Sequence, residues 1–367
     1  MPVTILIIGG YGFFGARIAA TLAADPNILL LIGGRDAGKA GSFAVSIGLP
    51  ETHAIAIDTF GGGLSQQLKE LRVDLVIHAA GPFQGQGYHV ARAAIAAGSH
   101  YADIADGRAF VNGIVELDPD ARRSGVLVTS GASSVPALSA AVVDRYAGRF
   151  GRLDTVDVGI SSSGRTPGLA TMRGVFGYCG KPFPGFDNGT WRVRHGWTNM
   201  RRHFFPLPVG RRWLADCDVP DLELFPRRYP SLRSVSFKAG LASPLAHWAV
   251  WAGASLVRMR MAQSLAPAAP LLHRMSRIFE PLASSDSAMF VGLRGIDRDG
   301  ASLDLCWHLI AEHGDGPFIP CGAAISLARK LARGDALPAA AMPCLGIVDL
   351  DDYLAALTGY AIRAVPP

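Results

Sequence analysis

The sequence has 367 residues, of which 49% are hydrophobic and 18% charged, and its formal net charge is +5. This length is too great for one core of ordinary size and indicates two folded domains, and the composition excludes a disordered chain. The Lys and Arg residues form no basic tail and no nucleic-acid motif is present, so we expect no nucleic-acid partner. An apolar strand begins almost at the first residue, so we expect no signal peptide and a cytoplasmic location.

A glycine-rich turn follows the first predicted strand, residues 3–8. Residues 10–15 read GYGFFG, and the next stretch, residues 16–24, is typical of a helix. A strand that leads through a G-x-G-x-x-G turn into a helix is the unit that binds a dinucleotide pyrophosphate. The pattern favours a dinucleotide site over a glycine-rich turn in an ordinary α/β protein, which is the alternative.

Each glycine of this turn has an expected structural role. Gly10 would allow the tight turn, Gly12 would let the backbone approach the phosphates, and Gly15 would let the helix lie close to the strand. The N–H groups at the start of the helix would face the anion. Phe13 and Phe14 lie in the same loop and are included among the predicted cofactor-binding residues.

The end of the second predicted strand, residues 28–32, indicates which dinucleotide binds. NAD sites usually carry Asp or Glu at this point, but here Gly33 and Gly34 lead to Arg35. A guanidinium would pair with the 2′-phosphate of NADP and stack on adenine, so we predict NADP. Asp36 keeps NAD open as the second choice, and a solvated loop cation is the alternative for Arg35.

Strands and helices continue to alternate up to about residue 130, which predicts a parallel, doubly wound sheet. The third strand ends at Asp58, which could lie beside adenine, and Gly98 is a predicted helix cap. The predicted strands are 52–58, 73–78, 101–104 and 126–129, and the predicted helices are 64–71, 87–97 and 109–124.

The pattern changes after about residue 150, where glycine, proline, arginine and aromatic residues become frequent. We predict a Rossmann domain over 1–150, a substrate or dimerisation domain of α+β type with a mixed sheet over 151–315, and C-terminal elements over 316–367 that return to the Rossmann domain. The later predicted elements are strands at 155–161, 289–293, 302–310 and 344–350, a turn at Asp299 and Gly300, a helix at 317–333 and a last helix after Asp349.

The longest nearly uncharged stretch, residues 245–257, contains Trp248 and Trp251. It is too short to span a bilayer. We expect a helix that covers the second sheet or forms a dimer face, and peripheral membrane contact is the alternative.

Five cysteines are scattered through the chain without C-x-x-C spacing. We therefore expect free thiols, no disulfide and no metal site.

The first 145 residues resemble the saccharopine dehydrogenase-like NAD(P)-binding oxidoreductases. The motifs that carry the resemblance are the glycine turn, AGPF at 80–83, GSHYAD at 98–103 and SGASSVP at 130–136. The resemblance implies a Rossmann domain, a second α/β domain and often a homodimer. It also implies that Ala80, Gly81 and Pro82 line the nicotinamide side of the cofactor.

Hydride transfer needs little from the side chains beyond positioning, so the proton donor is hard to assign. The family resemblance implies reduction of an imine C=N bond, or of a C=C bond in a lipid-active branch. For an imine, Asp103 could hold the iminium charge or relay a proton, and for an enoyl group Tyr178 or Tyr101 could donate the second proton. A buried phenol and a loop cap are the alternatives for Tyr101 and Asp103.

Cations and aromatic residues occur together between 165 and 197, which favours a small-molecule substrate with an apolar body and an anionic group over saccharopine itself. The predicted substrate-binding residues are Phe83, Ser133, Ser134, Arg165 and Arg173. Two alternatives stay open: a membrane-associated lipid enoyl reductase, and an NADP-binding sensor without activity.

Overall fold

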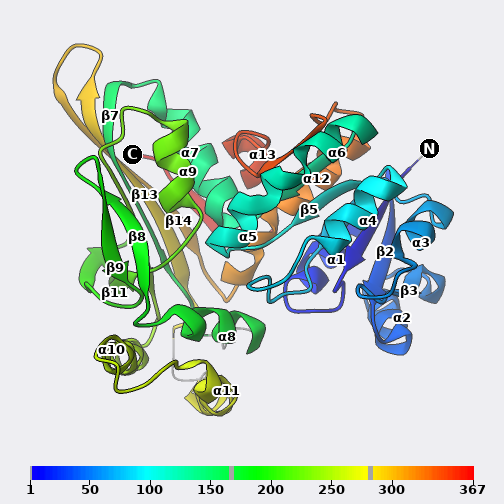
Figure 1. The fold of residues 1–367 in the computed structure, drawn as a ribbon, viewed down its shortest axis with the longest axis horizontal. Coiled ribbons are helices and arrows are strands. Elements are labelled where there is room, and N and C mark those ends of the chain that lie inside the picture. The colour runs from blue at the N-terminus through cyan, green and yellow to red at the C-terminus, as the bar shows by residue number, and fades with distance from the viewer. Residues whose placement is uncertain (1, 165–168, 280–283) are drawn as a thin grey trace. The chain divides into compact units, whose positions relative to one another are not determined.

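A computed structural model of the chain describes residues 2–164, 169–279 and 284–367. The chain divides into two compact units, 1–138 with 318–357 and 139–317 with 358–367. The predicted α/β class is confirmed, with a parallel sheet in the first unit and a mixed sheet in the second (Figure 1).

The first unit is built on a seven-stranded sheet in the order β15-β6-β5-β4-β1-β2-β3, with every neighbouring pair parallel. Within this sheet, β1 is almost completely buried, as expected for an apolar run with helices on both faces. The strands are β1 (Val3–Ile8), β2 (Ile28–Gly34), β3 (Ala54–Ala56), β4 (Leu75–His78), β5 (His100–Asp103), β6 (Leu127–Ser130) and β15 (Ala340–Pro343).

The direction in which successive strands are added to the sheet reverses between β1 and β4. Strands β2 and β3 lie on one side of β1, and β4, β5 and β6 lie on the other. Open α/β sheets bind ligands at this point, outside the carboxyl ends of the strands. The helices of this unit are α1 (Gly15–Leu22), α2 (Ala37–Ser46), α3 (Leu64–Glu70), α4 (His89–Ala97), α5 (Arg108–Gly113), α6 (Asp118–Ser124), α12 (Gly322–Ala332) and α13 (Leu350–Ala355).

Two predictions for this unit were wrong in detail. The helix predicted at 109–124 is broken into α5, a short 3-10 turn and α6, because Pro119 with two aspartates starts a new helix. The strand predicted at 344–350 lies at Ala340–Pro343 instead, where it pairs with β6, and residues 344–349 form the turn that Asp349 closes as the N-cap of α13.

The second unit has a nine-stranded mixed sheet in which β7 lies between β12, parallel to it, and β13, antiparallel to it. The main order is β10-β11-β12-β7-β13-β14-β16, and β8 and β9 join at β12. The strands are β7 (Phe150–Ser161), β8 (Pro182–Asp187), β9 (Thr190–His195), β10 (Arg201–Phe204), β11 (Arg211–Asp216), β12 (Ser234–Gly240), β13 (Ser287–Asp297), β14 (Ser302–Ala311) and β16 (Ile362–Val365).

Polar contacts connect two helices of this unit, α7 (Ser139–Ala147) and α9 (Asp221–Arg228). Asp144 on α7 accepts hydrogen bonds from Arg228 and Tyr229, and Ser139 donates to Asp221 at 2.6 Å. The helices α8 (Leu169–Tyr178), α10 (Pro244–Arg258) and α11 (Ala269–Phe279) lie at one end of the sheet (Figure 1).

The unit boundaries differ from the predicted ones at 150 and 315. The first unit ends at Leu138, because α7 packs against the second sheet and not the first. The last residues, 358–367, belong to the second unit because β16 pairs with β14.

The stretch 245–257 falls in α10, whose Trp248 packs edge-on against Trp213 of β11 with ring centroids 5.3 Å apart. The helix therefore covers part of the second unit, although Leu245 remains 81% exposed. Within the described ranges, no helix has the length and apolarity needed to cross a membrane.

Candidate functional site

The glycine turn after β1 is folded tightly against the start of α1. Gly9 has a φ of +79°, a value that favours glycine, and its carbonyl accepts a hydrogen bond from the N–H of Gly12 at 2.8 Å. A β-carbon on Gly15 would lie 2.1 Å from the carbonyl oxygen of Gly9. The first turn of α1 contains no acidic residue, so nothing there opposes an anion at the helix N-terminus.

The loop after β4 lies against this glycine turn. The N–H of Ala79 bonds to the carbonyl of Ile8 at 2.9 Å, and a β-carbon on Gly9 would come within 3.1 Å of the Ala80 side chain. Ala80 is partly exposed, and Gly81 and Pro82 are exposed. The carboxyl ends of β1 and β4 therefore bring together the two segments in which the sequence predicts pyrophosphate and nicotinamide contacts.

At the end of β2, the cation of Arg35 is exposed, and the carboxylate of Asp36 is bound by Lys39. Asp36 is the N-cap of α2: its side chain accepts from the N–H of Lys39 at 3.0 Å and lies 3.4 Å from the Lys39 ammonium. That backbone hydrogen bond, with the charge of Lys39, lowers the pKa of Asp36. Arg35 is exposed and has no ion-pair partner among the described residues. The Asp36 carboxylate is thus tied into the helix cap, while the Arg35 guanidinium is available to a ligand.

Tyr11 of the glycine turn reaches the same strand end. A β-carbon on Gly34 would lie 2.2 Å from ring atom Cε1 of Tyr11, and the N–H of Asp36 donates to the Tyr11 hydroxyl at 3.3 Å. A side chain at position 34 would therefore displace the Tyr11 ring.

Asp58 follows β3 and is exposed. Its carboxylate accepts from the N–H of Phe60 at 3.0 Å, and the Phe60 ring stacks on His89 with centroids 4.7 Å apart. Because Phe60 is 82% exposed, the strand end offers an aromatic surface as well as a carboxylate.

The two residues predicted as proton donors in this unit are in its interior. Asp103 is completely buried, and its Oδ1 accepts from Ser130 at 2.8 Å and from the N–H groups of Gly131 and Ala105 at 3.0 Å. Burial raises the pKa of Asp103 to about 6, against the effect of these donors. The hydroxyl of Tyr101, 1% exposed, lies 3.1 Å from Nδ1 of His78. Both side chains hold strand ends together, as a loop cap and a buried phenol do.

Three predicted substrate-binding residues of this unit are also buried. Phe83 packs edge-on against His78 with ring centroids 5.1 Å apart, and it is 6% exposed. Ser133 and Ser134 lie in the turn after β6, each 6% exposed. These residues line the interior of the loops and not their outer surface.

The remaining predicted residues belong to the second unit. Tyr178 ends α8 and its hydroxyl lies 2.7 Å from the Cys217 sulfur, while Arg173 is exposed on the same helix. Arg165 lies outside the described residues.

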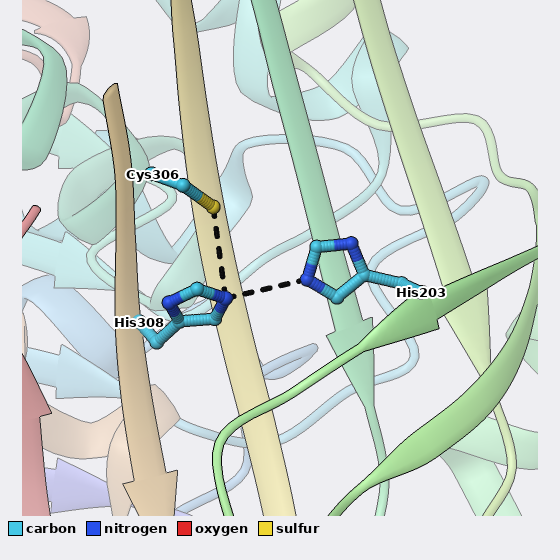
Figure 2. A group of neighbouring side chains, drawn as sticks. All are labelled: His203, Cys306 and His308. Carbon is cyan, nitrogen blue, oxygen red and sulfur yellow. Dashed lines mark hydrogen bonds between the residues drawn. The ribbon is translucent and has the colours of Figure 1, made fainter. Parts of the chain in front are cut away.

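The sheet of the second unit carries a cavity of about 230 Å³ that the sequence did not predict. It is lined by residues of β7, β10, β13 and β14: Asp157, Arg201, Arg202, His203, Phe290, Gly292, Arg294, Asp304 and Cys306. Figure 2 shows His203, Cys306 and His308 with their nitrogen and sulfur atoms directed toward one another. None of the five cysteines, all of which lie in the described part of the chain, forms a disulfide, and Cys306 is the one that is not buried.

This group could not be found from spacing, because about a hundred residues separate His203 from the other two. The one local signal is C-W-H at 306–308, which places a thiol and an imidazole on the same face of a strand. The partner histidine comes from β10, a strand that sequence analysis missed.

Residues 5–129 match the family model of the saccharopine dehydrogenase NADP binding domain. No curated protein matches the sequence. Among solved structures, apo saccharopine dehydrogenase (L-Glu forming) from Saccharomyces cerevisiae is similar over 100% of both chains, with 13% identity and a TM-score of 0.69. Amine dehydrogenase from Mycobacterium smegmatis is similar over 94% of this chain and 95% of its own, with 11% identity and a TM-score of 0.53. At these identities the solved structures show a common fold, and the family model confirms an NAD(P)-binding domain.

Proposed function

We propose that the chain, whose residues 5–129 match the saccharopine dehydrogenase NADP binding domain, is a saccharopine dehydrogenase-like oxidoreductase that uses NADPH to reduce the C=N bond of an imine. The proposed substrate is a small molecule with an apolar body and an anionic group. When bound, the cofactor supplies the hydride, so the protein has to bind, orient and exclude water.

The observation that carries the cofactor preference is the pair Arg35 and Asp36. The ribose 2′-hydroxyl of NAD needs an available carboxylate, and the Asp36 carboxylate is engaged by Lys39. A 2′-phosphate needs a cation, and Arg35 is exposed at the same strand end. Both facts favour NADPH.

The remaining contacts follow from the loops at the strand ends. Gly10, Gly12 and Gly15, with the Phe13 and Phe14 backbone, would hold the pyrophosphate at the N-terminus of α1. The Gly9 carbonyl lies 2.1 Å from where a β-carbon on Gly15 would be. Because Gly15 has no β-carbon, the helix can start this close to the turn, which supports the fit. Asp58 and the exposed ring of Phe60 would lie toward adenine, and Ala80, Gly81 and Pro82 toward nicotinamide.

We propose that Asp103 and Tyr101 are positioning residues. Asp103 holds the turn after β6 through Ser130 and Gly131, and Tyr101 supports His78 behind the β4 loop. The proton would then come from water or from a residue of the second unit, of which Tyr178 is the sequence-based candidate. Phe83 would support the nicotinamide-side loop from within.

Reduction of C=N is favoured over C=C by the kind of chemistry that proteins of this fold carry out. One such structure is an amine dehydrogenase, and removal of a hydride and a proton from an amine gives an imine. The exposed Arg173 on α8 suits an anionic group on the substrate.

A substrate panel tests the reaction. The purified chain is mixed with NADPH and with imines formed from amines and carboxylate-bearing carbonyl compounds, and in parallel with enoyl compounds of similar size. We expect NADPH consumption with imines and loss of it in Gly12→Val, whose side chain meets the Gly9 carbonyl. Consumption with enoyl compounds alone would contradict C=N reduction, and binding without any consumption would identify a sensor.

A second candidate, a membrane-associated lipid enoyl reductase, is favoured by the exposed apolar side of α10. Leu245, Trp248 and Leu256 are 81%, 41% and 42% exposed. Sedimentation with anionic liposomes tests it, comparing the Trp248→Ser/Trp251→Ser variant with Trp191→Ser, which removes an exposed tryptophan from β9. Loss of sedimentation in the double variant alone would support the lipid enzyme.

A further inference from the structure

We propose that His203, Cys306 and His308 form a zinc site on the sheet of the second unit, with a fourth position open to water or a small anion. The site lies wholly within that unit and is independent of the cofactor loops.

The strand geometry brings the three side chains together. Cys306 and His308 are two residues apart on β14, so both project from the same face of the sheet. Phe290 on β13 is paired with His308, and the His203 ring stacks on Phe290 with centroids 3.8 Å apart and planes within 8°. Phe290 therefore holds the imidazole of β10 beside that of β14.

Two of the three distances between the ligand atoms, both measured to Nε2 of His308, are those of a tetrahedral zinc site. Nε2 of His203 lies 3.3 Å from Nε2 of His308, and the Cys306 sulfur lies 3.6 Å from the same nitrogen. With Zn–N bonds of about 2.05 Å and Zn–S bonds of about 2.3 Å, tetrahedral geometry separates two nitrogens by about 3.3 to 3.4 Å and nitrogen from sulfur by about 3.5 to 3.6 Å. All three atoms lie within 4.8 Å of one another (Figure 2).

Hydrogen bonding alone explains this arrangement poorly. A neutral imidazole nitrogen carries either one proton or one lone pair, but Nε2 of His308 faces both the His203 nitrogen and the Cys306 sulfur. A metal ion would use one lone pair from each of the three atoms. Two imidazoles and a thiolate are ligands that zinc prefers.

Space remains for a fourth ligand. His203 and Cys306 line the cavity of about 230 Å³, and Gly292, paired with Cys306, contributes no side chain to it. Three protein ligands with an open position are typical of zinc sites that bind water or substrate. Three arginines line the same cavity with two aspartates, Arg201, Arg202 and Arg294 with Asp157 and Asp304, so its lining has an excess of one positive charge and a small anion is a suitable fourth ligand.

Cobalt is a suitable probe, because Co²⁺ replaces zinc in tetrahedral sites and absorbs visible light. The chain is dialysed against a chelator and titrated with Co²⁺ and then Zn²⁺. We expect one cobalt per chain, an intense tetrahedral spectrum with a thiolate-to-cobalt charge-transfer band, and displacement by one equivalent of zinc. The band should disappear in Cys306→Ser. Zinc affinity should fall by at least roughly 100-fold in His203→Gln and His308→Gln, more than is usually lost with a residue that only hydrogen-bonds to a ligand.

The matched control is His313→Asn, which removes an exposed imidazole from a turn of the same unit where a positive φ suits asparagine. It should bind cobalt as the unmodified chain does. A second measurement needs no variant: Cys306 is the one cysteine that is not buried, so a thiol reagent should modify one thiol quickly, and zinc should slow this reaction. Absence of stoichiometric binding, an unchanged band in Cys306→Ser, or a thiol that zinc leaves equally reactive would overturn the proposal.

Discussion

The carbonyl oxygen of Gly9 lies where a β-carbon of residue 15 would be, 2.1 Å from its ideal position. The oxygen belongs to the backbone and the backbone also fixes the position of a β-carbon, so neither atom could turn aside as the end of a long side chain could. The contact fixes how closely α1 begins behind β1, and through this spacing it determines where the helix N-terminus meets the strand end.

Gly15→Ala should therefore separate α1 from the glycine turn. We expect a loss of roughly 1 to 3 kcal/mol in the free energy of unfolding, the usual cost of an overpacked contact, together with loss of NADPH binding. Urea unfolding and cofactor fluorescence measure the two effects. Unchanged affinity for NADPH would contradict a pyrophosphate site at this turn.

Gly34→Ala should behave differently, because the obstructing group is the Tyr11 ring, which can move. We expect a change in unfolding free energy of about 1 kcal/mol or less and a several-fold weaker NADPH affinity. In a Tyr11→Ala background the same substitution should have little further effect on affinity. Equal effects in both backgrounds would show that the ring is not the cause.

Asp103→Asn separates positioning from proton transfer. Asparagine keeps an oxygen that accepts from Ser130 and from the N–H of Gly131, so a positioning role predicts a kcat within a few-fold of the unmodified chain and an unchanged pH profile. A general acid would lose roughly 100-fold or more in kcat. Steady-state kinetics measured across pH distinguish the two roles. A loss of roughly 100-fold in kcat, in a variant that is still folded, would contradict the positioning role.

His78 should make the protein sensitive to acid. Burial lowers its pKa from 6.5 to about 3, so between these values the unfolded chain binds a proton that the folded chain does not. Stability due to this group is therefore complete above pH 6.5 and declines as the pH falls, by roughly 2 kcal/mol at pH 5.

His78→Asn should remove this part of the pH dependence, whatever its effect on stability at neutral pH. Urea unfolding of both proteins at pH 7.5 and pH 5 gives the comparison. Parallel losses in the two proteins would show that another group carries the acid sensitivity.

Apart from β15, the Rossmann unit could be predicted well, because strands such as β1 and β2 are apolar runs that end in a turn signal. Val3–Ile8 before the glycine turn, and Gly98 with φ +77° after α4, are local signals that tertiary structure did not override. Broken helices were harder, since the apolar spacing of 109–124 continues across the 3-10 turn at Ile114–Leu117.

The second unit could be predicted only in part, because its strand pairing is non-local. β7 pairs with β12 and β13, and each partner is more than seventy residues away in sequence. The meeting of His203 with His308 depends on such pairings, and residue type alone did not suggest it. The burial of Asp103 depends on the pairing of β5 with β4 and β6 in the first unit, so residue type alone suggested a proton donor there.

The most direct test of the account is the cofactor preference of Arg35→Asp, compared with Arg123→Ala, which removes an exposed arginine from α6. Dissociation constants for NADPH and NADH are measured on all three proteins. A charge-assisted contact of about 1.5 to 3 kcal/mol predicts that NADPH affinity falls by roughly 10- to 150-fold in Arg35→Asp, while NADH affinity stays within a few-fold and the control is unchanged. If NADPH affinity does not fall relative to NADH, Arg35 does not bind the 2′-phosphate and the proposed use of NADPH loses its main support.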